Sequence, residues 1–308
     1  MLTGSTGSAL DIGTGLGLQG FDYISRVNGT QHEFSVVNTG RMLHWLDAEK
    51  GKHLRFAADG LLCASDNYGL HNWFTNKLRE YWIVKDPSSL FDASGEYYDN
   101  PCYLGGISGV FDFKNQSVYY TFTKKKESNG DRIVETGTAE TIEYSEAANQ
   151  YKTYHSFTPK VYMNYKENFF SPSPDLNYPV YAHDEGNKGL IYGTYYDSKL
   201  KFIVNPTPVE AKNFDNGSIA INTRTASDKL KTGIFEAADY VTQQINFQTD
   251  TRWKFLQGFV RYPTRGLNAP TRIRAKAMNI ELIVMNDVDN ETVRISNHVT
   301  DTRLSPKM

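Results

Sequence analysis

The sequence is poor in the features that most often reveal a function. Its 308 residues include two cysteines, Cys63 and Cys102, in different predicted elements, and two buried free thiols are favoured over one disulfide. Lys and Arg number 33 and Asp and Glu 35, so a net charge of −2 gives no argument for binding nucleic acid or a membrane. No apolar run approaches the roughly 18 residues of a membrane-spanning helix, and we expect no membrane insertion.

Motifs for catalysis, metals and cofactors are equally scarce. The histidines and cysteines show no H-x-x-x-H or C-x-x-C spacing, and no G-x-S-x-G is present. Residues 15–20 match the dinucleotide pattern G-x-G-x-x-G, but they lack the strand before and the helix after that such a site requires. His183, Asp184 and Glu185 are the one acid–base candidate, and we interpret them as a polar loop. The sequence predicts no catalytic residue, metal or cofactor, and therefore a protein that is not an enzyme.

The N-terminal residues 1–20 differ in composition from the rest. They contain six glycines among Ser and Thr, which predicts an extended or flexible segment. They also lack a basic region followed by a long apolar core, so we expect no signal peptide.

Aromatic residues, by contrast, are plentiful, with 20 Tyr and 17 Phe. Two hairpins dominate the middle of the chain, at residues 107–123 and 138–159. In the first, Val118, Tyr120 and Phe122 fall on one face and Ser117, Tyr119 and Thr121 on the other, an alternation that is typical of a half-buried strand. The pattern predicts antiparallel sheet.

Further short strands are predicted on both sides of these hairpins. Before them lie residues 21–27, 32–37, 41–47 and 53–57, separated by turns such as Asn28-Gly29, and one helix within residues 68–82. After them lie residues 161–165, 168–170, 178–182, 188–196, 200–204, 218–224, 234–242, 273–285 and 292–298. The Pro-containing segment 205–208 is the best internal boundary.

These elements predict an all-β fold with one short helix. Strand groups beginning near residues 21, 103 and 160 suggest antiparallel blades of a partial β-propeller, although a sandwich would give a similar pattern. We expect a flexible segment at 1–20, propeller-like blades at 21–205, and a smaller β-rich closing or interface region at 206–308.

The least ordinary charge feature is a strip without acidic residues at positions 251–280. Its cations are Arg252, Lys254, Arg261, Arg265, Arg272, Arg274 and Lys276. Three interpretations stay open: an exposed or internally paired basic face, a subunit interface, and contact with nucleic acid.

Several of these segments together resemble one family. The order YGLHNWF, GVFDFKNQSVYYTF, TIEYSEAANQYKTYHSFTPKVYMNYKENFF is similar to the virion muzzle, or tail stabilisation, proteins of crAss-like bacteriophages. Two later segments fit as well, FIVNPTPVEAKNFDN at 202–216 and the basic strand at 261–280. The resemblance covers roughly residues 20–285 and corresponds to the C-terminal portion of longer family members.

The resemblance implies a structural virion protein that closes the DNA channel at the distal end of a short tail, as tail nozzles do. It implies a ring-shaped homo-oligomer, contacts with other tail proteins, transient contact with packaged DNA, and synthesis in the host cytoplasm. The family pattern carries no catalytic residue. From a different class, a carbohydrate-binding or glycan-cleaving propeller is the alternative, because Tyr and Trp residues are numerous.

Overall fold

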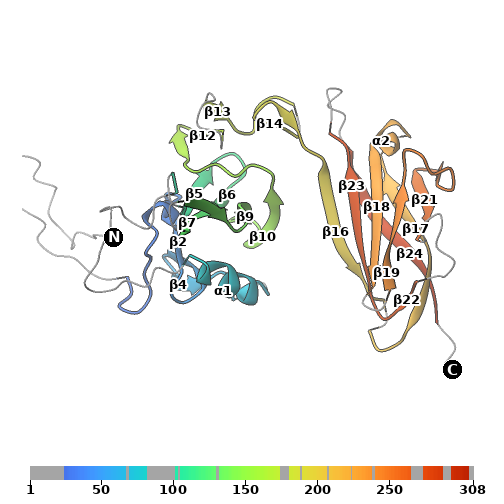
Figure 1. The fold of residues 1–308 in the computed structure, drawn as a ribbon, viewed down its shortest axis with the longest axis horizontal. Coiled ribbons are helices and arrows are strands. Elements are labelled where there is room, and N and C mark those ends of the chain that lie inside the picture. Colours follow the sequence, from blue (N-terminus) through green and yellow to red (C-terminus); the bar gives the residue numbers. More distant parts are fainter. Residues whose placement is uncertain are drawn as a thin grey trace, which may run out of the picture. The chain divides into compact units, whose positions relative to one another are not determined.

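The computed structural model describes the chain in two units with separate internal contacts. The described residues are 24–66, 69–81, 101–102, 105–129, 132–173, 180–187, 189–206, 208–222, 224–237, 240–264, 273–286 and 293–304. The N-terminal unit is Met1–Glu185 and the C-terminal unit is Gly186–Met308. Both are built mainly from antiparallel strands (Figure 1), which confirms the all-β prediction.

The first sheet of the N-terminal unit is a four-stranded meander. Its strands are β1 (Val37–Asn38), β2 (Leu43–Asp47), β3 (Lys52–Ala57) and β4 (Gly60–Cys63), in that spatial order. Gly51 lies in the β2–β3 turn at φ 67°, where a Cβ atom would be 2.7 Å from Cα of Thr75. Glycine therefore lets this turn approach the helix α1 closely.

The second sheet has the same up-and-down plan with one inserted hairpin. Its strands are β5 (Ile107–Asp112), β6 (Ser117–Phe122), β9 (Glu140–Ser145) and β10 (Gln150–His155), in the order β10-β9-β6-β5. The hairpin β7 (Lys125–Asn129) and β8 (Arg132–Thr136) is inserted between β6 and β9. Both predicted hairpins are thus confirmed.

One core joins these two sheets to α1 (His71–Arg79), the predicted helix. Phe74 and Leu78 on α1, Leu46 on β2 and Tyr120 on β6 are all fully buried in it. Such burial stabilises the fold by roughly 1.5–3 kcal/mol for each large apolar side chain. The 3₁₀ helix η1 (Glu33–Ser35) lies against β2 and β5.

Strand β6 is buried on both faces, so the prediction of a half-buried strand was wrong. Tyr120 faces the core described above, whereas Tyr119 stacks on Phe169 with ring centroids 5.3 Å apart. Phe169 belongs to a small sheet of β11 (Met163–Tyr165), β12 (Asn168–Pro172) and β13 (Val180–Ala182). Aromatic residues on the second face reflect this covering layer.

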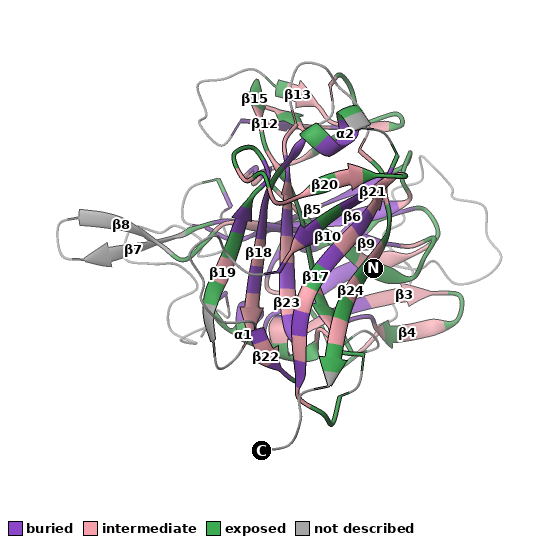
Figure 2. Ribbon diagram, turned by 90° about the vertical axis from the view of Figure 1, so that its right-hand side faces the viewer, coloured by how far each residue is buried: buried purple, intermediate pink, exposed green. Residues whose placement is uncertain are grey.

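The C-terminal unit has two sheets that share one core. One contains β16 (Ser198–Val204), β23 (Met278–Val284), β18 (Leu230–Ala237) and β19 (Tyr240–Asn246), in this order. In the other, β17 (Lys212–Ile221) pairs with β21 (Phe259–Pro263), β22 (Ile273–Ala275) and β24 (Ile295–Leu304), and β20 (Lys254–Leu256) extends from β21. Their inward side chains form one apolar cluster, as in a β-sandwich. Figure 2 shows buried and intermediate residues alternating along β23, several buried residues on β18, and only exposed and intermediate residues along the described part of β24.

Smaller elements complete the C-terminal unit. A short hairpin of β14 (Leu190–Ile191) and β15 (Thr194–Tyr195) precedes β16, and α2 (Arg224–Asp228) connects β17 to β18. Residues 205–208, where the sequence predicts a boundary, follow β16. No helix among the described ranges is long and apolar enough to cross a membrane.

Two sequence predictions fail near the N-terminus. Within residues 32–37, predicted as a strand, residues 33–35 form η1 and only Val37 is in a strand, and residues 24–27 carry no strand. Neither cysteine forms a disulfide, as expected, but the two are not buried: Cys63 is half-buried and Cys102 exposed. Residues 1–20, including the G-x-G-x-x-G pattern, lie outside the described residues.

Candidate functional site

The predicted basic strip separates into cations with different surroundings. Arg252 is paired with Asp250, whose carboxylate accepts hydrogen bonds of 2.6–3.0 Å from the guanidinium. These bonds lower the pKa of Asp250 and raise that of Arg252. Arg252 is thus paired within the chain. Its partner Asp250 lies just before the acid-free strip, which is why the strip itself shows no acid.

Lys254 and Arg261 are brought together by a tight hairpin. Strands β20 and β21 are joined at Gln257 and Gly258, which both have positive φ values of 52° and 78°. This turn places Lys254 directly opposite Arg261 in the ladder. Both side chains are exposed, and neither makes an ion pair within the described chain.

The remaining strip residues are further away or are not described. Arg274 lies on β22 opposite Asn213, while Arg261 lies opposite Ser218, which is about 16 Å further along β17. Lys276 follows β22 and is exposed. Arg265 and Arg272 lie outside the described residues.

A second group, which the sequence did not reveal, is a buried chain of two histidines. His44 on β2 and His53 on β3 are fully buried, and His44 Nδ1 lies 3.2 Å from His53 Nε2. At one end, His44 Nε2 lies 2.8 Å from Glu146 Oε1, and at the other, His53 Nδ1 lies 2.7 Å from the Tyr151 hydroxyl. The chain therefore connects the first sheet to residues that follow β9.

The surroundings of His53 oppose its protonation. Burial lowers its pKa well below the usual value of 6.5, and the neighbouring His44 and Arg55 lower it further. Burial likewise raises the pKa of Tyr151 well above 10.0. The spacing of the two histidines in the sequence does not reveal this pair. Their proximity follows from the register of β2 and β3, which the sequence alone does not give.

A third group lies on β6, β9 and β10 around Glu143. Burial alone would raise the pKa of Glu143, but hydrogen bonds from His155, Ser117 and Lys152 lower it to about 2. The distances to Glu143 oxygens are 3.0 Å from His155 Nε2 and 2.7 Å from Ser117 Oγ. Because Ser117 is fully buried, its hydroxyl is not accessible to a substrate.

The loop that was the acid–base candidate lies beside β12. His183 Nε2 is 2.6 Å from the hydroxyl of Ser171, and its ring stacks on Phe169. Burial lowers the pKa of His183 to about 4. Partial desolvation, a hydrogen bond to Asp112 and the charge of Asp112 raise the pKa of Asp184 to about 6. The neighbouring Asp112 thus favours the protonated form of Asp184.

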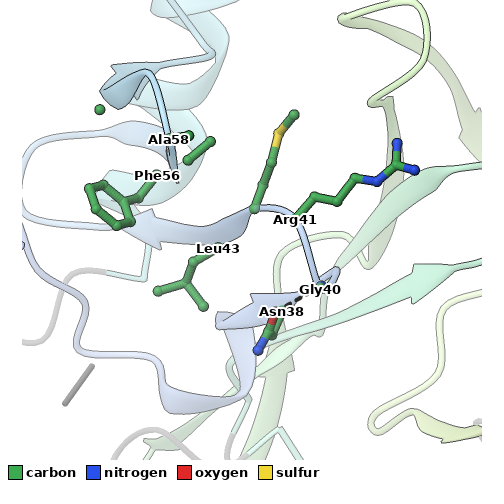
Figure 3. Close-up of a pocket in the computed structure, with 9 residues that line it drawn as sticks. Asn38, Gly40, Arg41, Leu43, Phe56 and Ala58 are labelled. Atoms are coloured by element: carbon green, nitrogen blue, oxygen red, sulfur yellow. Dashed lines mark hydrogen bonds between the residues drawn. The ribbon is translucent and has the colours of Figure 1, made fainter. Parts of the chain in front are cut away.

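A pocket of about 410 Å³ lies at the end of the first sheet, between the β1–β2 and β3–β4 turns. Leu43 and Phe56 form apolar walls, and no carboxylate is among its lining residues. Figure 3 shows the Arg41 side chain extending away from Phe56. The pocket therefore does not bring aromatic rings and paired acids together. Across the described residues, no group of three or more His, Cys, Asp or Glu is arranged to hold a metal ion.

Comparison with protein families gives two matches. The model of the Crassvirus muzzle protein matches residues 1–175, and that of the Crassvirus muzzle protein C-terminal domain matches residues 186–257. The first match ends within the N-terminal unit, and the second begins at residue 186, the first residue of the C-terminal unit. A search of curated proteins found no match.

Proposed function

Since the chain belongs to the Crassvirus muzzle protein family and is thereby a structural protein of the phage virion, we propose that it forms part of the distal tail assembly. In this role it closes the DNA channel of a short-tailed phage, like a tail nozzle. It is made in the host cytoplasm and contacts other tail proteins. The observation that carries the proposal is the family match, which extends over both units.

The form of the two larger sheets in the N-terminal unit supports a propeller-like ring. Each is a four-stranded antiparallel meander, which is the size and connectivity of one propeller blade. Blades of several copies arranged around an axis give a closed wall. A ring of identical copies follows when one contact repeats and closes on itself.

The polar groups of the N-terminal unit support a structural role and not an enzymatic one. His44 and His53 lie in the core between the sheets, and Glu143 is held by three hydrogen-bonding partners. Both stabilise packing between strands. Transient contact with packaged DNA would use exposed cations, of which Lys276 is one.

Quantitative mass spectrometry of purified virions tests the proposed role. We expect several copies per particle, present also after washing in high salt, together with other tail proteins. If the chain is absent from intact particles, or abundant only in the lysate, the proposal is wrong. Tailless particles provide the control, because they should lack the chain.

A further inference from the structure

The two units carry opposite net charges. The N-terminal unit, residues 1–185, holds 23 acidic and 16 basic side chains, a formal charge of −7. The C-terminal unit, residues 186–308, holds 12 acidic and 17 basic side chains, a formal charge of +5. The overall value of −2 hides this asymmetry. Surfaces of opposite sign attract each other when they belong to different copies of one chain.

Two exposed cations of the C-terminal sandwich, Lys254 and Arg261, lie side by side on one sheet. Strand pairing sets Lys254, Arg261, Ser218 and Val299 in one row across four strands. The adjoining row contains Leu256, Phe259, Ala220 and Asn297. Neighbours along these strands, Val260 and Ile219, are fully buried, so both rows lie on the outer surface of the sheet. We name these eight residues the Lys254–Arg261 face.

The Lys254–Arg261 face carries two neighbouring positive charges, which an acidic partner would neutralise. Like charges directly opposite each other in a ladder are destabilising, and Lys254 and Arg261 occupy such positions. The two rows contain no acidic residue. The nearest acid along β24, Asp301, lies in the next row, opposite Asn216.

Exposed aliphatic side chains accompany the cations. Leu256 is 51% exposed and Val299 47% exposed. An aliphatic surface with adjacent cations fits a protein partner that carries carboxylates beside apolar groups. Double-stranded DNA would instead favour a surface of cations and hydrogen-bond donors.

The N-terminal unit offers a matching surface at η1. Glu33 is exposed there and makes no ion pair within the described chain. Phe34 and Val36 beside it are 44% and 42% exposed. Glu167 also lies among exposed apolar residues, but its neighbour Lys166 adds a positive charge.

We propose that the Lys254–Arg261 face of one copy binds the η1 surface of a second copy of this chain, formed by Glu33, Phe34 and Val36. Each copy carries both halves, so the contact is head-to-tail and repeats around a ring. The inference rests on the proposed homo-oligomeric tail role and supplies the contact on which it depends.

Sedimentation velocity of the purified full chain tests the contact, at about 0.1 M and about 0.5 M salt. The wild type should self-associate, less strongly at the higher salt. The double variant Lys254→Glu, Arg261→Glu should weaken self-association at least about tenfold, because repulsion replaces attraction at the interface. Adding Glu33→Lys to that double variant should restore much of the loss.

Matched controls separate the contact from a general charge effect. Lys199→Glu, Lys201→Glu makes the same change in net charge at exposed positions of β16 and should leave self-association unchanged. The neutral pair Lys254→Gln, Arg261→Gln should give an intermediate loss, and circular dichroism checks the fold of each variant.

Several results would overturn the inference. The first is a monomeric wild type. The second is an equal loss of self-association in Lys254→Glu, Arg261→Glu and in the control Lys199→Glu, Lys201→Glu. The third is a failure of Glu33→Lys to restore self-association. A change in hydrodynamic radius without concentration dependence would assign the face to the same chain. Loss of DNA binding with unchanged self-association would assign it to nucleic acid. If virions contain the chain but these substitutions leave self-association unchanged, the proposed function is retained and the proposed contact is rejected.

Discussion

His53 makes the stability of the N-terminal unit depend on pH in a calculable way. Its ring is fully buried, and burial together with His44 and Arg55 lowers its pKa well below 6.5. The folded state therefore holds it neutral, while the unfolded chain protonates it near pH 6.5. The stability that the neutral His53 gives the folded state is fully present above pH 6.5 and is lost as pH falls below that value.

The size of the effect follows from proton linkage. One group that binds a proton only in the unfolded state costs about 1.4 kcal/mol for each pH unit below its unfolded pKa. His183 acts in the same direction, and Asp184, with its raised pKa, acts in the opposite one. Subtracting the unfolding free energy of His53→Gln from that of the wild type therefore isolates the contribution of His53. This difference should change by about 1.4 kcal/mol per pH unit between about pH 6 and 5.

Amide hydrogen exchange at β2 and β3 measures this slope within the N-terminal unit alone. Tyr151→Phe is the matched control, because it removes the hydrogen bond to His53 Nδ1 and keeps the titrating ring. It should lower the free energy of opening by roughly 1 kcal/mol and leave the slope unchanged. Equal slopes in wild type and His53→Gln would refute the buried neutral state of His53.

Three further substitutions, one of them with a matched control, test packing and electrostatics. Phe74→Ala should lower the free energy of unfolding by about 3–5 kcal/mol in urea titrations, because the ring is fully buried between α1 and both sheets; a loss below about 1 kcal/mol would contradict this. Gly217→Ala would put a Cβ 2.5 Å from Tyr262 Cζ and should cost about 1–3 kcal/mol by thermal unfolding, whereas Gly29→Ala, with open space around it, should be near neutral. Glu143→Gln should reduce the loss of stability that the wild type shows as pH falls from 4.5 to about 2, because in this range the unfolded chain protonates Glu143 and the folded chain does not. Acid titration followed by circular dichroism measures this loss, and an unchanged profile would contradict the prediction.

Local pattern predicted the regular part of the fold. The hairpins at β2–β3, β5–β6 and β9–β10 and the helix α1 combine alternating or helical apolar periodicity with turn residues, and all were found. The failure at η1 has a tertiary cause. The segment 32–37 buries the side chains of His32 and Ser35 and leaves Phe34 and Val36 exposed.

The candidate sites were less predictable, because they depend on register. The sequence identified the cations of the basic strip but not that Arg252 is paired and that Lys254 opposes Arg261. The chain from Glu146 through His44 and His53 joins residues from hairpins about 100 positions apart. No spacing rule within a single hairpin detects such a contact.

Cryo-electron microscopy of intact virions would locate the chain in the assembled particle. We expect density for this chain at the distal end of the tail, repeated in several copies around the tail axis. In that density the strands β20 and β21 of the C-terminal sandwich should face a neighbouring copy. Density for the chain on the capsid, a single copy per tail, or no density at all would rule out the proposed role in the tail.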